Sequence, residues 1–202
     1  DISPELIKRR SFIPPKCPVF ESPYTILKET DRYEFYNHPE PRKQLPDIID
    51  NRVQVVEGVD SLENSLRENY SKKRRIGIVF SGGPAPGGHN VIAGLFDAAK
   101  KANPESSVLG FIQGPDGIME NEAVELTPEL VDRFRNLGGF CMIKTGRTKI
   151  DTREKMKLSS ETLKELGVDS LVVVGGDDSN TNAAFLRSEE RRVGKECATG
   201  CR

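Results

Sequence analysis

The stretch IGIVFSGGPAPGGHN, residues 76–90, decides the fold class of this chain. Its first five residues form a short apolar run that ends at a glycine turn, which is the pattern of a strand buried inside a parallel sheet. Residues 90–101 follow, with Val91, Leu95 and Ala99 spaced to share one face of a helix. A strand, a glycine loop and a helix in succession predict the first unit of an α/β domain.

The same alternation continues toward the C-terminal end. Apolar runs at 107–112 and 171–174 predict two more strands, and helices are predicted over 128–137 and 152–166, the latter with Thr152 as N-cap. Strands that alternate with helices imply a mainly parallel sheet covered on both faces. The expected fold class is therefore α/β, a three-layer sandwich preceded by a proline-rich extension.

Three segments of the chain differ in composition. Residues 1–70 form the proline-rich extension, where interleaved aromatic residues favour an ordered segment packed on a body over a free tail. Residues 71–186 hold the alternating strands and helices. Residues 187–202 begin RSEERRVGKEC, which resembles one reading frame of a sequencing adapter translated into protein. We predict a non-native tail there; the other interpretation is a genuine charged helix surface.

Composition argues against several classes of function. The 30 basic and 31 acidic residues give a net charge of -1, which disfavours nucleic acid or an anionic membrane as the main partner. The basic run at 72–75 is interpreted as a solvated lead-in to a strand rather than a targeting patch. No apolar run approaches the roughly 20 residues needed to span a bilayer, and the opening segment lacks the apolar core of a signal peptide. Four scattered cysteines predict neither a zinc site nor a disulfide framework, so a cytoplasmic location is expected.

The glycine loop at 81–90 is placed to bind an anion. A loop that follows a parallel strand lies at the carboxyl end of the sheet, where ligands bind. Glycine lets backbone N–H groups approach a phosphate closely, and the start of the next helix adds roughly half a positive charge. The loop is neither GxGxxG nor GxxxxGK[ST], so a dinucleotide fold and a P-loop lysine are not indicated. Taken alone it also fits a plain tight turn, and His89 is expected to pack at the helix start rather than act as a catalyst.

A second glycine loop follows the strand predicted at 171–174. The sequence GGDDSNTN places Asp177 and Asp178 before a helix whose cap is expected near Ser179 or Asn180. A carboxylate on an anion-binding loop suits Mg²⁺, which takes oxygen ligands and bridges to phosphates. An isolated pair of aspartates is explained more simply by the preference of carboxylates for helix starts. Two such loops in one sheet favour the metal site.

Three motifs, SGGPAPGGHN, GGFCMIKTGR and GGDDSNTNA, occur in this order along the chain. Together they resemble the phosphofructokinase superfamily, and in particular its long pyrophosphate-dependent class of plants and spirochaetes, over about residues 51–186. The resemblance implies a phosphofructokinase-like fold and a reversible glycolytic reaction. In that reaction pyrophosphate gives a phosphoryl group to the 1-hydroxyl of fructose 6-phosphate, with Mg²⁺. It also implies a homo-oligomer, such as a dimer, or a hetero-oligomer.

The resemblance implies a role for each motif residue. Gly82 and Gly83 would meet the pyrophosphate through the backbone, and Ser179 would bind it as well. Arg147 would place a guanidinium on the transferred phosphoryl group, whose developing charge must be met by fixed donors. Asp177 would be the Mg²⁺ carboxylate.

Asp178 would select the phosphoryl donor. ATP-using relatives have glycine at this position, which leaves room for the α-phosphate of the nucleotide. Two like charges about 4 Å apart repel by on the order of 4 kcal/mol at an effective dielectric near 20. A carboxylate here would therefore exclude ATP while pyrophosphate still fits.

The chain also departs from the family pattern. The catalytic aspartate of the family belongs to a Thr-Ile-Asp-type motif with a neighbouring lysine, and these 202 residues contain neither that motif nor the sugar-phosphate residues. We therefore expect this polypeptide alone to bind ligand weakly and not to turn over. Lys144 and Thr145 stand where smaller residues are expected. The alternatives are an ATP-dependent phosphofructokinase, a non-catalytic regulatory subunit and a simple anion-binding module.

Overall fold

The computed structural model describes residues 3–30, 39–44 and 54–187, and the chain divides into two compact units. The smaller unit is Ile13–Tyr70, and the larger one combines the N-terminal 12 residues with the chain from Ser71 onward. Apart from Arg187, the predicted non-native tail lies outside the described residues. None of the described helices is long and apolar enough to cross a membrane.

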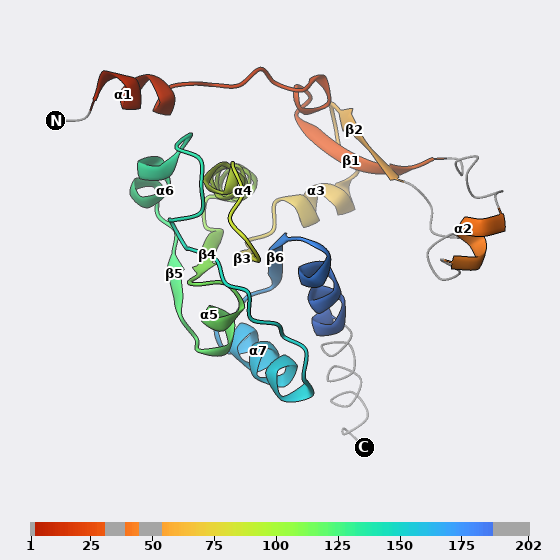
Figure 1. Cartoon of the computed structure of the whole chain (residues 1–202). Coiled ribbons are helices and arrows are strands. Elements are labelled where there is room, and N and C mark those ends of the chain that lie inside the picture. The colour runs from red at the N-terminus through yellow and green to blue at the C-terminus, as the bar shows by residue number, and fades with distance from the viewer. Residues whose placement is uncertain (1–2, 31–38, 45–53, 188–202) are drawn as a thin grey trace. The chain divides into compact units, whose positions relative to one another are not determined.

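A four-stranded sheet in the order β5-β4-β3-β6 lies at the centre of the larger unit (Figure 1). Strand β3 (Arg75–Ser81) runs parallel to β4 (Ser107–Phe111) on one side and to β6 (Ser170–Gly175) on the other. Strand β5 (Ala123–Glu125) pairs antiparallel with β4. The sheet is therefore mainly parallel, and the three strands predicted from apolar runs are confirmed.

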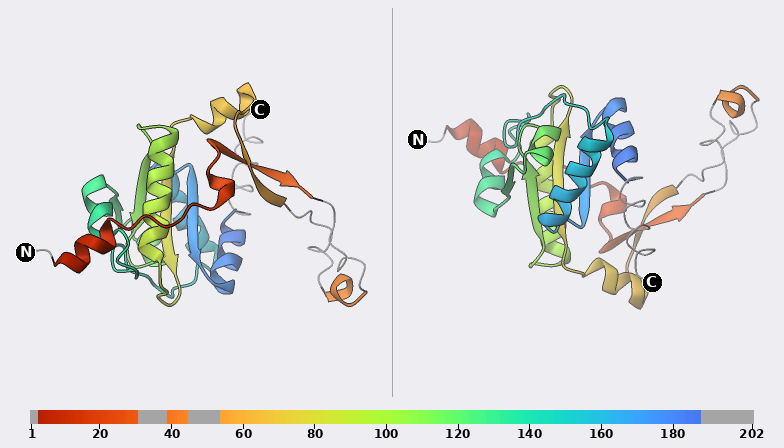
Figure 2. Two further views of the ribbon diagram at one scale, coloured as in Figure 1. Left: turned by 90° about the horizontal axis from the view of Figure 1, so that it is seen from above. Right: turned by 90° about the horizontal axis from the view of Figure 1, so that it is seen from below.

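Helices cover both faces of this sheet (Figure 2). One face is covered by α4 (Gly88–Ala102) and α6 (Pro128–Phe134), and the other by α5 (Pro115–Met119), α7 (Arg153–Glu165) and a helix at 177–187. This arrangement gives the three layers that the alternating pattern predicts.

Strand β3 explains why both faces need covering. Its side chains alternate between the two faces, as they do in every strand. Ile78 and Phe80 are buried in the core beneath α4, whereas Val79 is buried in the core beneath α7. Because apolar residues occupy both sets of positions, the strand reads as a continuous apolar run rather than an alternating one.

The end of one predicted helix differs from the sequence prediction. Helix α6 ends at Phe134 instead of Leu137, because Arg135 leaves the helical conformation with ψ 128. The next residue, Asn136, adopts φ 58, and its backbone N–H donates to Asn90 Oδ1 at 2.9 Å. A left-handed residue cannot continue a right-handed helix. Helix α7 matches its prediction: the Thr152 hydroxyl caps its start at Lys155 N, and Gly167 with φ 65 follows its end.

The elements that the structure describes in the smaller unit, within residues 13–30, 39–44 and 54–70, are short, as its proline content predicts. Strands β1 (Tyr24–Glu29) and β2 (Gln54–Val59) pair antiparallel. The remaining elements are η1 (Pro18–Phe20), α2 (Pro39–Gln44) and α3 (Asn64–Tyr70). Helix α1 (Pro4–Arg10) belongs to the larger unit. The segment after it is held there by Asn136, whose Nδ2 donates to Phe12 O at 2.8 Å.

Candidate functional site

Two strand ends and one connecting segment meet at the carboxyl edge of the sheet. Ser81 at the end of β3 pairs with Gly175 at the end of β6 and forms a parallel bridge with Gly146. The N–H of Gly82 donates to Gly146 O at 2.8 Å, and the Thr145 hydroxyl donates to Gly82 O at 2.8 Å. The three sequence motifs, which are far apart in the chain, therefore lie together.

The motifs line two adjoining hollows at this edge. The larger has a volume of about 640 Å³ and lies between the first glycine loop and the GGDD loop. The other adds the segment that carries Arg147 and Lys149. Each site residue predicted from the sequence lines at least one hollow: Gly82, Gly83, Arg147, Asp177, Asp178 and Ser179.

The Arg147 guanidinium lies over the first glycine loop. One of its terminal nitrogens is 3.2 Å from the position that a Cβ would take on Gly83, so any larger residue there would press on the guanidinium. The Arg147 side chain makes no hydrogen bond or ion pair with the residues that the structure describes. Its five donors are thus available to an anion in the hollow.

Gly82 supports the loop through its backbone. It adopts φ 106, a conformation that L side chains rarely take, and both its N–H and its C=O bond to the 145–146 segment. The N–H of Gly82 is thus already bonded. The N–H of the neighbouring Gly83 has no acceptor within the described chain.

Ser179 joins the two strand ends. Its side chain is buried, and its hydroxyl donates to Ser81 Oγ at 2.8 Å and lies 3.3 Å from Ser81 O. The close approach requires glycine at 175, because a Cβ there would collide with Ser179 Oγ. The serine thus fixes the distance between the two glycine loops.

The helix after β6 begins earlier than its predicted cap near Ser179 or Asn180. It starts at 177, and the carbonyl of Gly176 accepts from Asn180 N at 3.0 Å as the first helical bond. Glycine serves as the cap, and the two aspartates occupy the first turn, where the unpaired N–H groups favour negative charge. Asp177 and Asp178 are both exposed at the wall of the hollow.

The two aspartates differ in their partners. Asp178 Oδ2 lies 2.9 Å from Lys149 Nζ, whereas the carboxylate of Asp177 has no hydrogen bond or ion pair with described residues. No group of three or more His, Cys, Asp or Glu side chains gathers anywhere in residues 3–30, 39–44 and 54–187. A cation at Asp177 would therefore need further oxygen ligands from water and from a bound anion, which is how Mg²⁺ binds with phosphates.

The two departures from the family pattern have structural roles. Lys144 adopts φ 59, in the left-handed region that favours glycine, at a turn before Thr145. Thr145 provides the hydroxyl that bonds to Gly82 O. The threonine thus ties the Arg147 segment to the first glycine loop.

A backbone crossing that the sequence did not reveal supports the Arg147 segment. At Gly146 a Cβ would collide with Gln113 O, and at Gly114 it would collide with Gly146 N. Next to this crossing, the Thr148 hydroxyl donates to Asp116 Oδ2 at 2.7 Å. In the sequence, this crossing is indicated only by a glycine that follows a strand and precedes a proline, in Gln-Gly-Pro.

Replacing Gly146 with alanine is expected to lower the free energy of unfolding by about 1–3 kcal/mol, because the added methyl meets a carbonyl that cannot rotate away. Urea unfolding of the variant measures this effect. Gly94→Ala is the matched control: Gly94 lies in α4 with open space around its Cβ position, so alanine there should leave stability unchanged or raise it by up to about 1 kcal/mol. Equal free energies of unfolding for the two variants would contradict the close contact between Gly146 and Gln113 O.

His89 is buried at the start of α4, in the packing role expected from the sequence. Its Nε2 accepts from Met142 N at 3.1 Å, and its ring lies against Phe134 with centroids 4.9 Å apart. Burial lowers the pKa of His89, which keeps the ring neutral and able to accept this bond. The histidine thereby anchors the chain that leads to Arg147.

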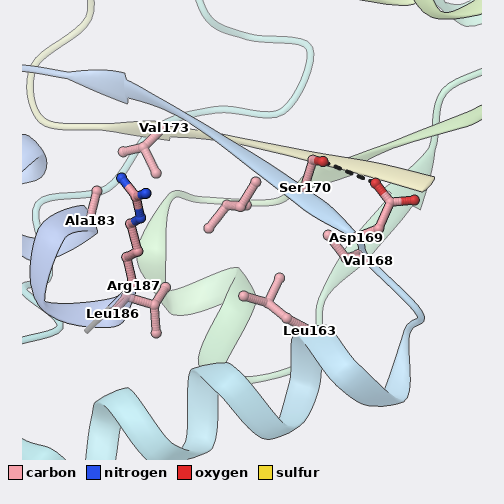
Figure 3. Close-up of a pocket in the computed structure, with 9 residues that line it drawn as sticks. Leu163, Val168, Asp169, Ser170, Val173, Ala183, Leu186 and Arg187 are labelled. Atoms are coloured by element: carbon pink, nitrogen blue, oxygen red, sulfur yellow. Dashed lines mark hydrogen bonds between the residues drawn. The ribbon is translucent and has the colours of Figure 1, made fainter. Parts of the chain in front are cut away.

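A third hollow lies beside β6, between α7 and the helix at 177–187 (Figure 3). Its wall is mainly apolar and includes Leu163, Val173 and Leu186, and the Ser170 hydroxyl donates to Asp169 Oδ1 at 3.0 Å. It shares no residue with the two hollows at the carboxyl edge. The third hollow therefore contains none of the candidate site residues.

Relatives of the chain carry one recurring name. The chain is 56% identical over 111 residues to the pyrophosphate–fructose 6-phosphate 1-phosphotransferase of Porphyromonas gingivalis, covering 55% of this chain and 20% of the relative. It is 46% identical over 136 residues to that of Treponema pallidum, covering 66% and 24%. It is 41% identical over 184 residues to subunit beta 2 of the Arabidopsis thaliana enzyme, covering 91% and 32%. The chain thus spans between a fifth and a third of the length of these relatives.

The comparisons also include solved structures and a family model. The phosphofructokinase of Pichia pastoris in the T-state matches with a TM-score of 0.48 and 26% identity, over 68% of this chain and 15% of that chain. The family model for phosphofructokinase matches residues 75–197, which is more than half of the chain and includes all three motifs. The chain therefore belongs to the phosphofructokinase family.

Proposed function

We propose that this chain forms the pyrophosphate-binding part of an enzyme that transfers a phosphoryl group from pyrophosphate to the 1-hydroxyl of fructose 6-phosphate. The observation that carries the proposal is the unpaired Arg147 guanidinium over Gly83, in a hollow that also holds Asp178. The relatives named above are called pyrophosphate-dependent phosphotransferases, which agrees with this proposal.

Each group at the carboxyl edge has a chemical role in this proposal. Gly83 N–H and the Arg147 guanidinium bind the phosphate oxygens, and Arg147 meets the charge that develops on the transferred group. Gly82 and Ser179 hold the loops at the right separation through their bonds to the 145–146 segment and to Ser81. Mg²⁺ would be held by Asp177 together with pyrophosphate oxygens, and it would supply charge neutralisation of the phosphates.

Donor choice is assigned to Asp178 in this proposal. Its carboxylate stands at the wall shared by both hollows. A negative charge there repels the additional phosphate of ATP and leaves pyrophosphate room to bind.

Assembly and location complete the proposal. Plant relatives are named as beta and alpha subunits, which supports the hetero-oligomeric alternative for the full-length enzyme. Cys17 and Cys141 are free thiols, which supports a cytoplasmic location.

The proposal is tested by donor-dependent turnover of the full-length protein that contains this chain. Formation of fructose 1,6-bisphosphate is followed with fructose 6-phosphate, Mg²⁺ and either pyrophosphate or ATP. We expect turnover with pyrophosphate and a kcat/KM for ATP at least about tenfold lower, since a carboxylate repulsion of about 1.4 kcal/mol already gives that factor. Turnover with ATP and none with pyrophosphate would overturn the proposal in favour of an ATP-dependent phosphofructokinase.

A further inference from the structure

Lys149 enters the candidate site without any role in the function proposed above. It lies two residues after Arg147 on an extended segment, and both side chains line the same hollow. Its Nζ is 2.9 Å from Asp178 Oδ2, so it contacts the one carboxylate to which donor choice is assigned. A salt bridge between two motif segments thus lies inside the site.

The backbone around Lys149 is fixed on both sides. The Thr148 hydroxyl donates to Asp116 Oδ2 at 2.7 Å, and the carbonyl of Lys149 accepts from Lys155 Nζ at 3.0 Å. The next residue, Ile150, is buried in the core under α7. The lysine therefore reaches Asp178 from a backbone that is bonded on one side and packed on the other.

The charges of the hollow explain what the pair does. An unpartnered Asp178 would repel pyrophosphate as well as ATP, since both carry several negative charges. With Lys149 the hollow is lined by two cations and one carboxylate, so its charge favours an anion. The side chains of Lys149 and Asp178 are 52% and 76% exposed, and exposed pairs add little to folding stability. The effect of the pair should therefore appear in ligand binding rather than in unfolding.

We propose that Lys149 is a positioning residue for pyrophosphate. It pairs with Asp178, holds that carboxylate at the wall of the hollow and neutralises it toward pyrophosphate. This inference rests on the proposed function, because it deepens the account of how the same site accepts pyrophosphate although Asp178 lies at its wall.

The test is a double-mutant cycle in the full-length protein, with Lys149→Gln, Asp178→Asn and both together. At low ionic strength Lys149→Gln should raise the KM for pyrophosphate about tenfold, while the KM for fructose 6-phosphate stays unchanged. In the Asp178→Asn background, Lys149→Gln should raise the KM for pyrophosphate less than about threefold, because the negative charge that the lysine neutralises is gone. The effect should shrink at high salt, since an exposed pair is screened. Lys149→Arg should restore most of the affinity.

Lys157→Gln is the matched control. Lys157 Nζ lies 3.8 Å from Glu161 Oε1 in another exposed lysine–carboxylate pair, on α7 and away from both hollows. Its removal should leave all kinetic constants unchanged.

The outcomes separate this inference from the proposed function. Suppose that the unmodified protein turns over with pyrophosphate, and that the KM for pyrophosphate of Lys149→Gln stays within twofold of the unmodified value. That result would overturn the inference and leave the proposed function standing. An equal rise in KM with and without the Asp178→Asn change would also overturn it, because Lys149 would then act independently of the carboxylate. A full-length protein with no pyrophosphate-dependent turnover would overturn both.

Discussion

Replacing Asp178 with glycine in the full-length protein is expected to raise the kcat/KM for ATP about 10- to 100-fold and to weaken the use of pyrophosphate. Two like charges about 4 Å apart repel by roughly 1 kcal/mol in water and roughly 4 kcal/mol at an effective dielectric of 20. The Asp178 side chain is 76% exposed and its charge is offset by Lys149, which places the charge repulsion nearer the lower limit, so the volume of the side chain must supply the rest of the effect. Glycine removes both the charge and the volume of the side chain.

Initial rates with ATP and with pyrophosphate measure this change in donor preference. Asp178→Asn is the matched control, because it removes the charge and keeps the volume. If charge dominates, asparagine should give most of the gain with ATP; if volume dominates, only glycine should. An unchanged ratio of ATP to pyrophosphate use in Asp178→Gly would contradict the assignment of donor choice to this residue.

Replacing Arg147 with alanine is expected to lower kcat with pyrophosphate about 10²- to 10³-fold. Fixed donors directed at a developing charge commonly contribute a factor of this size. The free energy of unfolding should change by less than about 0.5 kcal/mol, because the guanidinium makes no hydrogen bond or ion pair with the described residues. Steady-state kinetics and urea unfolding of the full-length variant measure the two effects.

Two further variants sharpen the Arg147 test. Arg147→Lys keeps the charge and loses the planar fork of donors, so it should recover only part of kcat. Arg153→Ala removes an exposed arginine from the start of α7, outside both hollows, and should leave kcat unchanged. A full kcat in Arg147→Ala would exclude a role for this residue in phosphoryl transfer.

The central part of the fold could be predicted from the sequence. Strands β3, β4 and β6 are short apolar runs followed by turns, because parallel strands are buried on both faces. Strand β5 and helix α5 have three and five residues, too few for a periodic pattern. The pairing of β1 with β2 was missed for another reason: residues distant in sequence decide it, and the prolines between them suggested irregular structure.

The sequence also predicted that the two glycine loops lie together, because the strand ends of a parallel sheet meet at one edge. Arg147 was placed with them only by the family resemblance, and the binding of pyrophosphate by these residues stays a prediction. The individual contacts could not be predicted. These contacts depend on how separate segments of the chain pack together. They are the hydrogen bond from Gly82 N–H to Gly146 O, the burial of Ser179 against Ser81 and the ion pair of Lys149 with Asp178. The start of the last described helix was misplaced because Gly176, rather than a serine or an asparagine, provides its cap.

The claim that the three motifs form one pyrophosphate site is tested most directly by a crystal structure of the full-length protein with pyrophosphate and Mg²⁺. We expect phosphate oxygens within hydrogen-bond distance of Gly83 N and the Arg147 guanidinium. The metal ion should be bound to Asp177, whereas Asp178 should still be paired with Lys149. Pyrophosphate bound elsewhere, with Arg147 pointing away from it, would contradict this claim.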